Sequence, residues 1–409
     1  MALYEETNYS GFRMNDTEVL IVGGGISGCL VACELHDAGF DVLIVDKNED
    51  LISESSRWNE GKIHLGYTYL GLPSLQTARL MMEGASLFVD KIEQITGCLL
   101  ADSWWTRRMI YLVDSNSLVP SEDLWIRAQK VTALLKDMAR RKPGLRRYIS
   151  TEKALRRIST KTVMEETRQN GFTDAWETSE KSIDPFQIAC LIRHAVSERG
   201  IPKVKARVTG FSRQDNYWCT HTNHQKLTSN WVVNASWESR AWLDKQIKDD
   251  AEPICIRYKC ALFGRGAADF AKRRPTSRIL GPYGDITPYQ NGAFYLSWYP
   301  VNLVSISETG MAPKIGIIDE NKMKHDTLEA LGLNGSDLGI PIEDIGVRGG
   351  YIVAYGHGDI DTMSSALHDR SRPSVKLLHP GYISIDTGKY SLGPYMASQA
   401  VQLIISGST

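Results

Sequence analysis

Three glycines, Gly23, Gly25 and Gly28, follow directly after a short apolar run and constrain the fold more than any other feature. The run 18–22 is apolar and rich in β-branched residues, which predicts a buried strand. The glycines match the G-x-G-x-x-G pattern, in which small residues allow a tight turn, a close approach of backbone to phosphate and close helix–strand packing. A helix over 26–38 would then direct its free N–H groups at an anion. The pattern predicts a βαβ unit that binds a dinucleotide.

A second strand and an acidic residue complete this unit. Gly39 is placed to end the helix as a C-cap glycine, and residues 41–45 form a second β-branched run. Asp46 follows about 20 residues after the glycines, where ribose hydroxyls need an acceptor. A tight turn without a ligand would require neither three glycines nor the terminal acid.

Composition narrows the class of protein. The chain has 409 residues, of which 42% are hydrophobic, and this is enough for two domains or one large interleaved fold. Its formal net charge of -1 argues against nucleic acid as the main partner. The seven cysteines form no C-x-x-C pair, so neither a metal site nor a disulfide framework is expected. No run approaches the roughly 20 apolar residues of a membrane span, and residues 1–15 do not resemble a secretory signal, so a cytoplasmic location is expected.

The rest of the chain alternates between two kinds of structure. Helices are expected at 73–96, from a cap at Ser121 to 142, at 185–199 and at the C-terminus, with a solvated, helix-rich stretch at 146–168 and short helices at 311–338. Strands are expected at 204–211, 217–222, 231–235, 254–263, 292–299 and 351–355. We predict an α/β fold in which a Rossmann-like dinucleotide domain (14–85, 180–250 and 340–409) is interleaved with a substrate domain on an antiparallel sheet (86–179 and 251–339).

Four separated segments resemble the D-amino-acid oxidase family of flavoproteins, which includes glycine and sarcosine oxidases. They are the glycine loop through Asp46, the serine-rich segment 53–64 with Asn59 and Gly61, the segment from Asp184-Pro185 through Val208 to 232–235, and the stretch 381–394. Together they cover about a third of the chain, in the order typical of the family. The resemblance implies an FAD domain of the glutathione-reductase type, joined to an antiparallel sheet that covers the flavin.

The motif and the resemblance together define a set of expected FAD-binding residues. Glycines and serine hydroxyls suit a diphosphate because they offer donors without steric bulk, and Lys389 or the last helix's N-terminus suits the charge of a reduced flavin. The expected residues are Gly23, Gly25, Ile26, Ser27, Gly28, Asp46, Lys47, Ser55, Ser56, Arg57, Asn59, Gly61, Lys62, Val208, Ala235, Gly388, Lys389, Tyr390 and Ser391.

The sequence also departs from the family pattern. Trp58 and Glu60 are bulky where the family usually has small residues, and Ser236-Trp237 stands where many members have Ala-Gly. Sarcosine oxidases use a lysine above the flavin to activate oxygen, and the best-matching strand here carries Ser297 instead. This favours a dehydrogenase with another electron acceptor as an alternative to an oxidase.

Candidate catalytic residues follow from the expected reaction, in which an enzyme of this type positions a C–H bond and excludes water. A carboxylate-bearing substrate needs an arginine, for which Arg348 is the first choice and Arg257 the second. Lys62 and His64 would project from the same side of an extended segment, with either as a base or charge partner near the flavin. The remaining candidates for the pocket wall or its polar edge are Tyr258, Trp298, Tyr299, His357 and the run His368-Asp369-Arg370.

The sequence therefore predicts an FAD-dependent oxidoreductase that oxidises a C–N bond of an amine or amino-acid-like small molecule. Its partners would be that substrate and oxygen or another electron acceptor. One alternative keeps FAD but oxidises a C–OH bond or acts on a larger metabolite. Two others are a flavoprotein without catalysis and an NAD-dependent dehydrogenase, and the latter gives the serine-rich and C-terminal segments no role.

Overall fold

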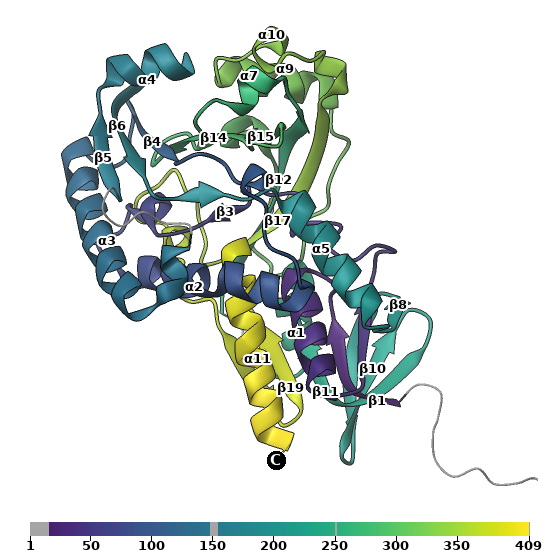
Figure 1. Cartoon of the computed structure of the whole chain (residues 1–409). Coiled ribbons are helices and arrows are strands. Elements are labelled where there is room, and N and C mark those ends of the chain that lie inside the picture. Colours follow the sequence, from purple (N-terminus) through teal and green to yellow (C-terminus); the bar gives the residue numbers. More distant parts are fainter. Residues whose placement is uncertain (1–15, 148–153, 250–251, 409) are drawn as a thin grey trace, which may run out of the picture.

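The computed structural model describes residues 16–147, 154–249 and 252–408, which form two sheets with helices packed around them (Figure 1). The segment 1–15, on which the expectation about a secretory signal depends, lies outside these residues. Within the described residues, no helix is both long and apolar enough to cross a lipid bilayer.

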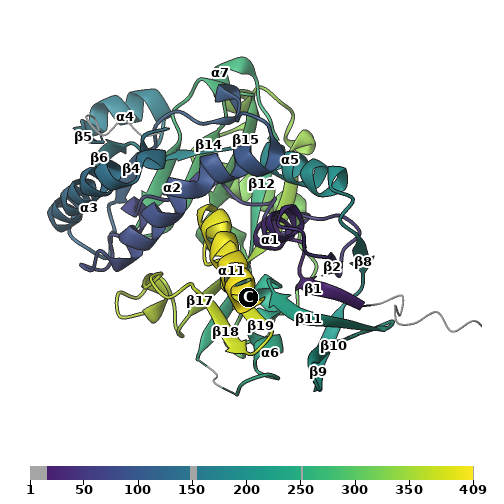
Figure 2. The ribbon, with the colours of Figure 1, turned by 60° about the horizontal axis from the view of Figure 1, so that its bottom comes forward.

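The first sheet has eight strands and a parallel centre in the order β18-β19-β11-β1-β2-β8, with the hairpin of β9 and β10 extending from β11 (Figure 2). Val19, Leu20 and Ile21 in β1 are fully buried, as expected for a central strand covered on both faces. The bounds are β1 Asp16–Val22, β2 Val42–Asp46, β8 Lys203–Lys205, β9 Val208–Gln214, β10 Tyr217–Thr222, β11 Lys226–Asn234, β18 Val375–His379 and β19 Tyr382–Ile385.

The second sheet has nine strands in the order β16-β12-β15-β14-β13-β4-β6-β5, with β17 also paired to β12. All its pairs are antiparallel except that of β13 with β4. The bounds are β4 Ile110–Asp114, β5 Leu155–Ile158, β6 Phe172–Thr178, β12 Ile254–Arg265, β13 Thr276–Ile279, β14 Gly284–Pro288, β15 Ala293–Trp298, β16 Leu303–Ser307 and β17 Gly346–Tyr355; β3 Lys62–Ile63 and β7 Lys181–Ser182 form a separate pair.

Helices cover the first sheet and join it to the second. Helix α1 packs against α11 and α5. Helix α2 runs between the part of the molecule built on the first sheet and the part built on the second (Figure 1). The bounds are α1 Ile26–Asp37, α2 Gln76–Thr96, α3 Ser121–Arg141, α4 Thr160–Thr167, α5 Pro185–Glu198, α6 Arg240–Asp244, α7 Ala268–Ala271, α8 Tyr299–Asn302, α9 Glu320–Ala330, α10 Gly335–Leu338 and α11 Gly393–Ser408.

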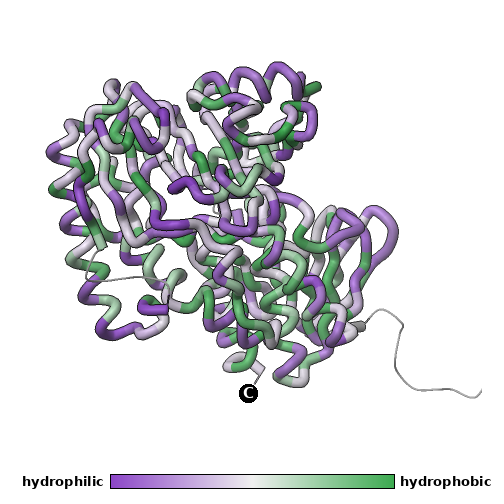
Figure 3. Tube along the Cα trace, turned by 45° about the horizontal axis from the view of Figure 1, so that its top comes forward, coloured by the Kyte–Doolittle hydropathy of each residue, from purple (hydrophilic) through white to green (hydrophobic). Residues whose placement is uncertain are grey.

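One large hydrophobic cluster spans both sheets, and smaller clusters lie within each sheet. The large cluster includes Val19 and Ile21 of the first sheet together with Tyr111 and Trp176 of the second. Figure 3 shows hydrophobic residues concentrated around the parallel strands and hydrophilic residues in many of the outer turns. Because the core is continuous, the two sheets are held against each other by apolar packing.

The structure corrects several local expectations. Ser121 is the first helical residue rather than the cap, and its hydroxyl donates to Asp174 at 2.7 Å. The stretch 146–168 contains a strand, β5, because residues 155–158 pair with β6. The expected strand 204–211 is divided into β8, which pairs with β2, and β9, which pairs with β10.

The expected domain ranges remain a prediction, but the structure places part of one range in the other sheet. Strand β17 lies within the range 340–409 that was expected in the dinucleotide domain. Its full length pairs with β12 of the nine-stranded sheet. The helix at the C-terminal end of that range, α11, does pack on α1.

Candidate functional site

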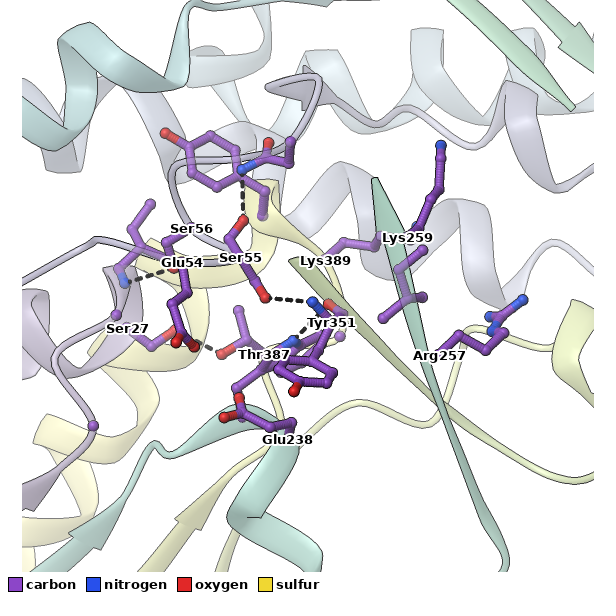
Figure 4. A pocket seen from close by; sticks show the side chains of 18 of the residues that line it. Ser27, Glu54, Ser55, Ser56, Glu238, Arg257, Lys259, Tyr351, Thr387 and Lys389 are labelled. Carbon is purple, nitrogen blue, oxygen red and sulfur yellow. Dashed lines mark hydrogen bonds between the residues drawn. The ribbon is translucent and has the colours of Figure 1, made fainter. Parts of the chain in front are cut away.

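A cavity of about 500 Å³ lies where the two sheets meet, and every one of its walls comes from a different part of the chain. The glycine loop, the serine-rich segment and residues 206–209 and 235–243 form one end. Residues of β12, β13 and α8 and the segment 360–370 form the other, with Gly388, Lys389 and Tyr390 also in the lining. Figure 4 shows Ser27 and Ser56 at one side of this cavity and Arg257 and Lys259 at the other.

The glycine loop is packed so closely that side chains are excluded from it. Gly23 has a φ of +104°, and a Cβ there would lie 2.6 Å from the carbonyl oxygen of Ala235. A Cβ on Gly28 would lie 2.0 Å from the carbonyl oxygen of Gly23. The backbone of this turn therefore borders the cavity directly, at the N-terminus of α1, where N–H groups bind anions.

Two serine hydroxyls fix the second loop against this turn. Ser56 Oγ accepts a hydrogen bond from the Ile26 N–H at 3.1 Å, and Ser55 Oγ accepts one from the Tyr351 N–H at 2.8 Å (Figure 4). Each hydroxyl keeps its own hydrogen for donation, because its oxygen acts as the acceptor in these bonds. Ser27 Oγ lies 2.8 Å from Thr387 Oγ1, which joins α1 to the C-terminal loop.

The end of β2 carries an ordered carboxylate. Asp46 accepts hydrogen bonds from the N–H groups of Gly24 and Asn48, both at 2.7 Å, and lines the cavity. The next residue, Lys47, forms an ion pair with Glu238 at 2.6 Å. Burial alone would lower the pKa of Lys47, but Glu238 and Glu54 outweigh it and raise that pKa above its ordinary range.

Trp237 gives a physical reason for one departure from the family pattern. Its φ is +52°, a conformation that favours glycine and strains a bulky residue. The indole N–H donates to the Tyr351 carbonyl oxygen at 2.9 Å, and the ring packs on buried side chains of β12 and β17. These contacts compensate for the strain and add an aromatic ring to the cavity wall.

The opposite end of the cavity is rich in buried cations. Arg257 is only 3% exposed; its Nη1 donates to the Tyr299 hydroxyl at 2.8 Å, and its Nε is buried without a partner. Arg370 is 8% exposed and donates to the Val353 carbonyl oxygen at 2.8 Å. Burial, with Arg257 acting in the same direction, lowers the pKa of Arg370 to about 10.

Two lysines lie beside these arginines. Lys259 Nζ donates to Tyr295 Oη at 3.1 Å and to Ser297 Oγ at 3.0 Å, so a lysine from β12 reaches the position where the sequence alone indicated only Ser297. Lys389 Nζ lies 5.8 Å from the ring centre of Tyr69. Burial and the nearby Arg370 lower the pKa of Lys389 to about 7.

A network of acids and bases continues from the cavity into the core. Lys62 pairs with Asp285 at 2.9 Å, and its Nζ also donates to Ser277 Oγ at 3.0 Å. His64 is 3% exposed and lies 3.8 Å from both Glu60 and Glu180.

Burial controls the charge states in this network. Burial lowers the pKa of His64 well below its ordinary value, and Lys389 and Lys62 act in the same direction. Burial raises the pKa of Glu180 to about 7, and the Tyr111 hydroxyl donates to its carboxyl group. For Glu60, burial would raise the pKa, but Lys62 and Lys389 outweigh it and hold that pKa below its usual range.

Most of the expected cofactor-binding residues come together in this cavity. Those in its lining are Gly23, Gly25, Ile26, Ser27, Asp46, Lys47, Ser55, Ser56, Asn59, Lys62, Val208, Ala235, Gly388, Lys389 and Tyr390, and His64 joins them. Asn59 is occupied within its own loop, where its side chain bonds the Ser55 carbonyl oxygen at 2.9 Å and the Gly61 N–H at 2.7 Å.

Four expected cofactor residues lie behind the lining. Gly28 and Gly61 permit close backbone packing, and a Cβ on Gly61 would lie 1.8 Å from the Ile183 carbonyl oxygen. The Arg57 guanidinium stacks between Trp58 and Phe186, at 4.5 and 4.6 Å from the ring centres. Ser391 is buried, and its hydroxyl has no partner among the described residues.

Three expected catalytic residues also lie outside the cavity lining. Arg348 is exposed on β17, with its guanidinium 5.8 Å from the Trp58 ring centre, so of the two candidate arginines Arg257 lines the cavity and Arg348 does not. Tyr258 packs edge-on against Tyr351 at 5.0 Å, and the Trp298 ring lies against Arg278 at 5.4 Å. His357 is about half exposed and lies 3.6 Å from Glu308 rather than in the cavity.

Sequence reasoning did not single out Lys259, Glu60 and Tyr283 as residues of the site, although all three line it. Lys259 was detectable from the strand pattern, because Arg257 and Lys259 are two residues apart on β12 and therefore share a face. Within residues 16–147, 154–249 and 252–408, no group of three or more metal-ligating side chains is placed to hold a metal ion.

Comparison with known proteins identifies related chains. A family model described as FAD dependent oxidoreductase matches residues 18–295. Over 77 residues the chain is 45% identical to a glycerol 3-phosphate oxidase of Mycoplasma pneumoniae, a match covering 19% of this chain and only 20% of that relative.

Two solved structures show the same fold over nearly the whole chain. They are glycine oxidase from Geobacillus kaustophilus, with a TM-score of 0.66, 13% identity and coverage of 96% of this chain and 95% of the other, and iminodiacetate oxidase from Chelativorans sp. BNC1, with a TM-score of 0.66, 13% identity and 95% coverage of each chain.

Proposed function

The chain belongs to the DAO family of FAD-dependent oxidoreductases, and from this premise we propose that it oxidises a C–N bond of an amine or amino-acid-like small molecule. The observation that supports this most directly is Arg257, a buried arginine with an unpartnered Nε in the cavity lining. A buried guanidinium needs an acceptor, and a substrate carboxylate is the acceptor whose geometry suits it.

The residues of the cavity fit FAD. A Cβ on Gly23 or Gly28 would collide with backbone, so no side chain at these positions separates the turn beside α1 from a pyrophosphate at the helix N-terminus. We propose that the Ser55 and Ser56 hydroxyls donate to the same region and that Asp46 accepts from a ribose hydroxyl. When bound, FAD supplies the acceptor for a hydride from the substrate carbon.

The other end of the cavity would bind and orient the substrate. Arg257, held by the Tyr299 hydroxyl, binds the substrate carboxylate, and the Glu60 carboxylate pairs with the substrate ammonium group. Lys389, whose pKa burial lowers to about 7 and whose side chain lines the cavity, accepts the proton that the ammonium group must lose before oxidation. Tyr69, Tyr283 and Tyr299 form walls that exclude water from the reacting bond.

The proposed function is tested by anaerobic reduction of the purified holoenzyme. We expect amino acids and secondary amines to bleach the visible flavin absorbance and to release the imine hydrolysis product. Matched hydroxy acids, in which the amine is replaced by a hydroxyl group, should leave the spectrum unchanged. Reduction by the hydroxy acids alone would instead establish oxidation of a C–OH bond, and a flavin that no ligand reduces would contradict both.

The electron acceptor is a separate part of the proposal, and we propose oxygen. Lys259 supports this choice, because its ammonium group reaches the cavity beside Ser297 and a fixed cation favours the transfer of charge to oxygen. Lys259→Met should then slow reoxidation by oxygen by about 100-fold while anaerobic reduction of the flavin continues. Equal reoxidation rates in the parent and the variant would favour another acceptor.

A further inference from the structure

We propose that the substrate carries two negative charges, as a dicarboxylate or a phosphate monoester does. This inference rests on the proposed function, because it describes the ligand of the same cavity. It comes from the group formed by Arg257, Lys259, Arg370 and Lys389, called here the cation group.

No member of the cation group has a carboxylate partner among the described residues. Arg257 and Lys259 are held by the hydroxyls of Tyr299, Tyr295 and Ser297, and Arg370 by a carbonyl oxygen. The Lys389 ammonium group lies over the face of Tyr69. Hydroxyls and carbonyls orient a cation but do not neutralise it, and an unneutralised buried charge is costly.

The cations are close enough to act on one ligand. The Arg257 guanidinium and the Lys259 ammonium group each lie 5.9 Å from the ring centre of Tyr299. Arg257 and Arg370 both line the cavity, and Arg257 acts with burial to lower the pKa of Arg370 to about 10. The geometry therefore concentrates positive charge at one end of a single cavity.

The nearby acids do not offset this charge. Asp285 is paired with Lys62, Asp386 with Arg240 and Asp114 with Arg278, at 2.9, 3.2 and 2.7 Å. Glu60 is the remaining carboxylate at this end of the lining. With Glu60 ionised and Lys389 uncharged, Arg257, Lys259 and Arg370 leave an excess of two positive charges, which one dianion would neutralise.

The phosphates of FAD do not account for the cation group. The anion-binding turn, Ser27 and Ser56 lie at the far side of the cavity from Arg257 and Lys259 (Figure 4). A monoanionic amino acid would satisfy Arg257 alone and leave the charge of Arg370 and Lys259 without a partner. A substrate with two anionic groups, or with one group that carries two negative charges, would balance the positive charge of the cation group.

The test measures binding to the oxidised holoenzyme without turnover. Acetate, succinate and methyl phosphate are titrated at constant ionic strength and about pH 8, where a phosphate monoester carries close to two charges. Isothermal calorimetry and the shift of the visible flavin spectrum report the dissociation constants. We expect succinate or methyl phosphate to bind at least about tenfold more tightly than acetate.

The outcome also distinguishes the two sources of a dianion. Tighter binding of succinate indicates a dicarboxylic substrate, and tighter binding of methyl phosphate indicates a phosphate ester. Equal binding of all three anions, or binding of none, overturns the inference. A holoenzyme that prefers dianions but is reduced by no amine would contradict the proposed function and leave this inference standing.

Matched arginine variants connect the preference to the cation group. Arg370→Met should abolish the preference for dianions, and Arg257→Lys, which keeps the charge, should retain most of it. Arg348→Met is the control, because Arg348 is an exposed arginine outside the cavity lining, and its preference should equal that of the parent. If Arg370→Met fails to retain FAD, Arg257→Met replaces it; an undiminished preference in both methionine variants contradicts the proposal.

Discussion

At the scale of single residues, the cavity holds more charge in the interior than the chain neutralises by itself. Lys389 shows the cost most clearly, because burial and Arg370 lower its pKa from the ordinary value near 10.5 to about 7. Arg257 and Lys62 act in the same direction, and Glu60 opposes them. Such a lysine destabilises the folded protein whenever it is protonated.

This shift gives a pH prediction for Lys389→Met. Above a pH of about 7 the unfolded chain holds a proton that the folded protein has released, so the contribution of Lys389 to stability rises with pH up to the unfolded pKa. The variant should therefore melt at least about 2 °C above the parent at about pH 6, and this advantage should shrink toward about pH 10. Melting temperatures measured across this range provide the check, with the exposed Lys161→Met as control; parallel curves for Lys389→Met and the parent would contradict the expectation.

Gly28 provides a second prediction at this scale. A Cβ at Gly28 would lie 2.0 Å from the Gly23 carbonyl oxygen, so Gly28→Ala must displace α1 from the turn. We expect a loss of about 1–3 kcal/mol in the free energy of unfolding, as for other overpacked sites, together with a lower content of bound FAD. Gly316→Ala is the control, because no atom lies within 4 Å of its Cβ position. Urea denaturation and the ratio of visible to ultraviolet absorbance measure both effects, and normal FAD content in Gly28→Ala would refute the expectation.

Residue types identified the lining around the glycine loop better than the lining around Arg257. Gly23, Ser56 and Asp46 lie in contiguous motifs whose spacing follows from the shape of a βαβ turn. Arg257 and Arg370 come from different elements, and only the folded sheet brings them together. Arg348 was the preferred arginine because it precedes two glycines, but it is exposed and lies outside the lining, a placement that depends on the register of β17 against β12.

At the scale of elements, helices and strands with strong end signals were predicted well. Asp184 and Pro185 begin α5 as predicted, and its N–H at Phe186 donates to the Asp184 carboxylate at 3.0 Å. Segments without such signals were predicted poorly. Strand β5 is short and charged, and it is a strand only because it pairs with β6. Strand β17 was expected in the domain of the first sheet. Its pairing with β12 shows that it belongs to the second sheet.

The cap of α5 is also a connection between elements, which leads to a prediction for Asp184→Ala. The second carboxylate oxygen accepts a hydrogen bond from the Asn291 side chain at 2.8 Å, next to β15. Losing the cap and this bond should lower the free energy of unfolding by about 1–2 kcal/mol. Chemical denaturation measures the change, and Asp184→Asn, which retains an oxygen for the cap, should lose less. Equal stability of Asp184→Ala and the parent would show that neither bond contributes.

At the scale of the whole molecule, the expected class of fold is confirmed: a Rossmann-like FAD-binding body combined with an antiparallel sheet. What the sequence did not reveal is that a single hydrophobic core joins them. Periodicity identifies the apolar face of each element but not the element it packs against, so the common core became visible only in the structure.

The common core predicts cooperative unfolding of the two sheets. Trp176 lies in the second sheet and Trp218 in the first, and both are buried. In urea, the fluorescence of Trp176→Phe and Trp218→Phe variants, each reporting the remaining tryptophans, should change at the same midpoint as far-UV circular dichroism, because the cluster that contains Trp176 also includes Val19 and Ile21 of the first sheet. Two transitions with distinct midpoints would indicate that the sheets unfold independently.

The division of labour along the chain has a consequence for how such a protein diversifies. The anion-binding turn belongs to β1 and α1, whereas Arg257 and Arg370 belong to β12 and to the turn before β18. Under the proposed function, a few substitutions in those two short stretches would redirect selectivity toward a new metabolite without disturbing capture of the prosthetic group. Related proteins could therefore differ in substrate at the Arg257 end of the cavity and keep the same glycine turn.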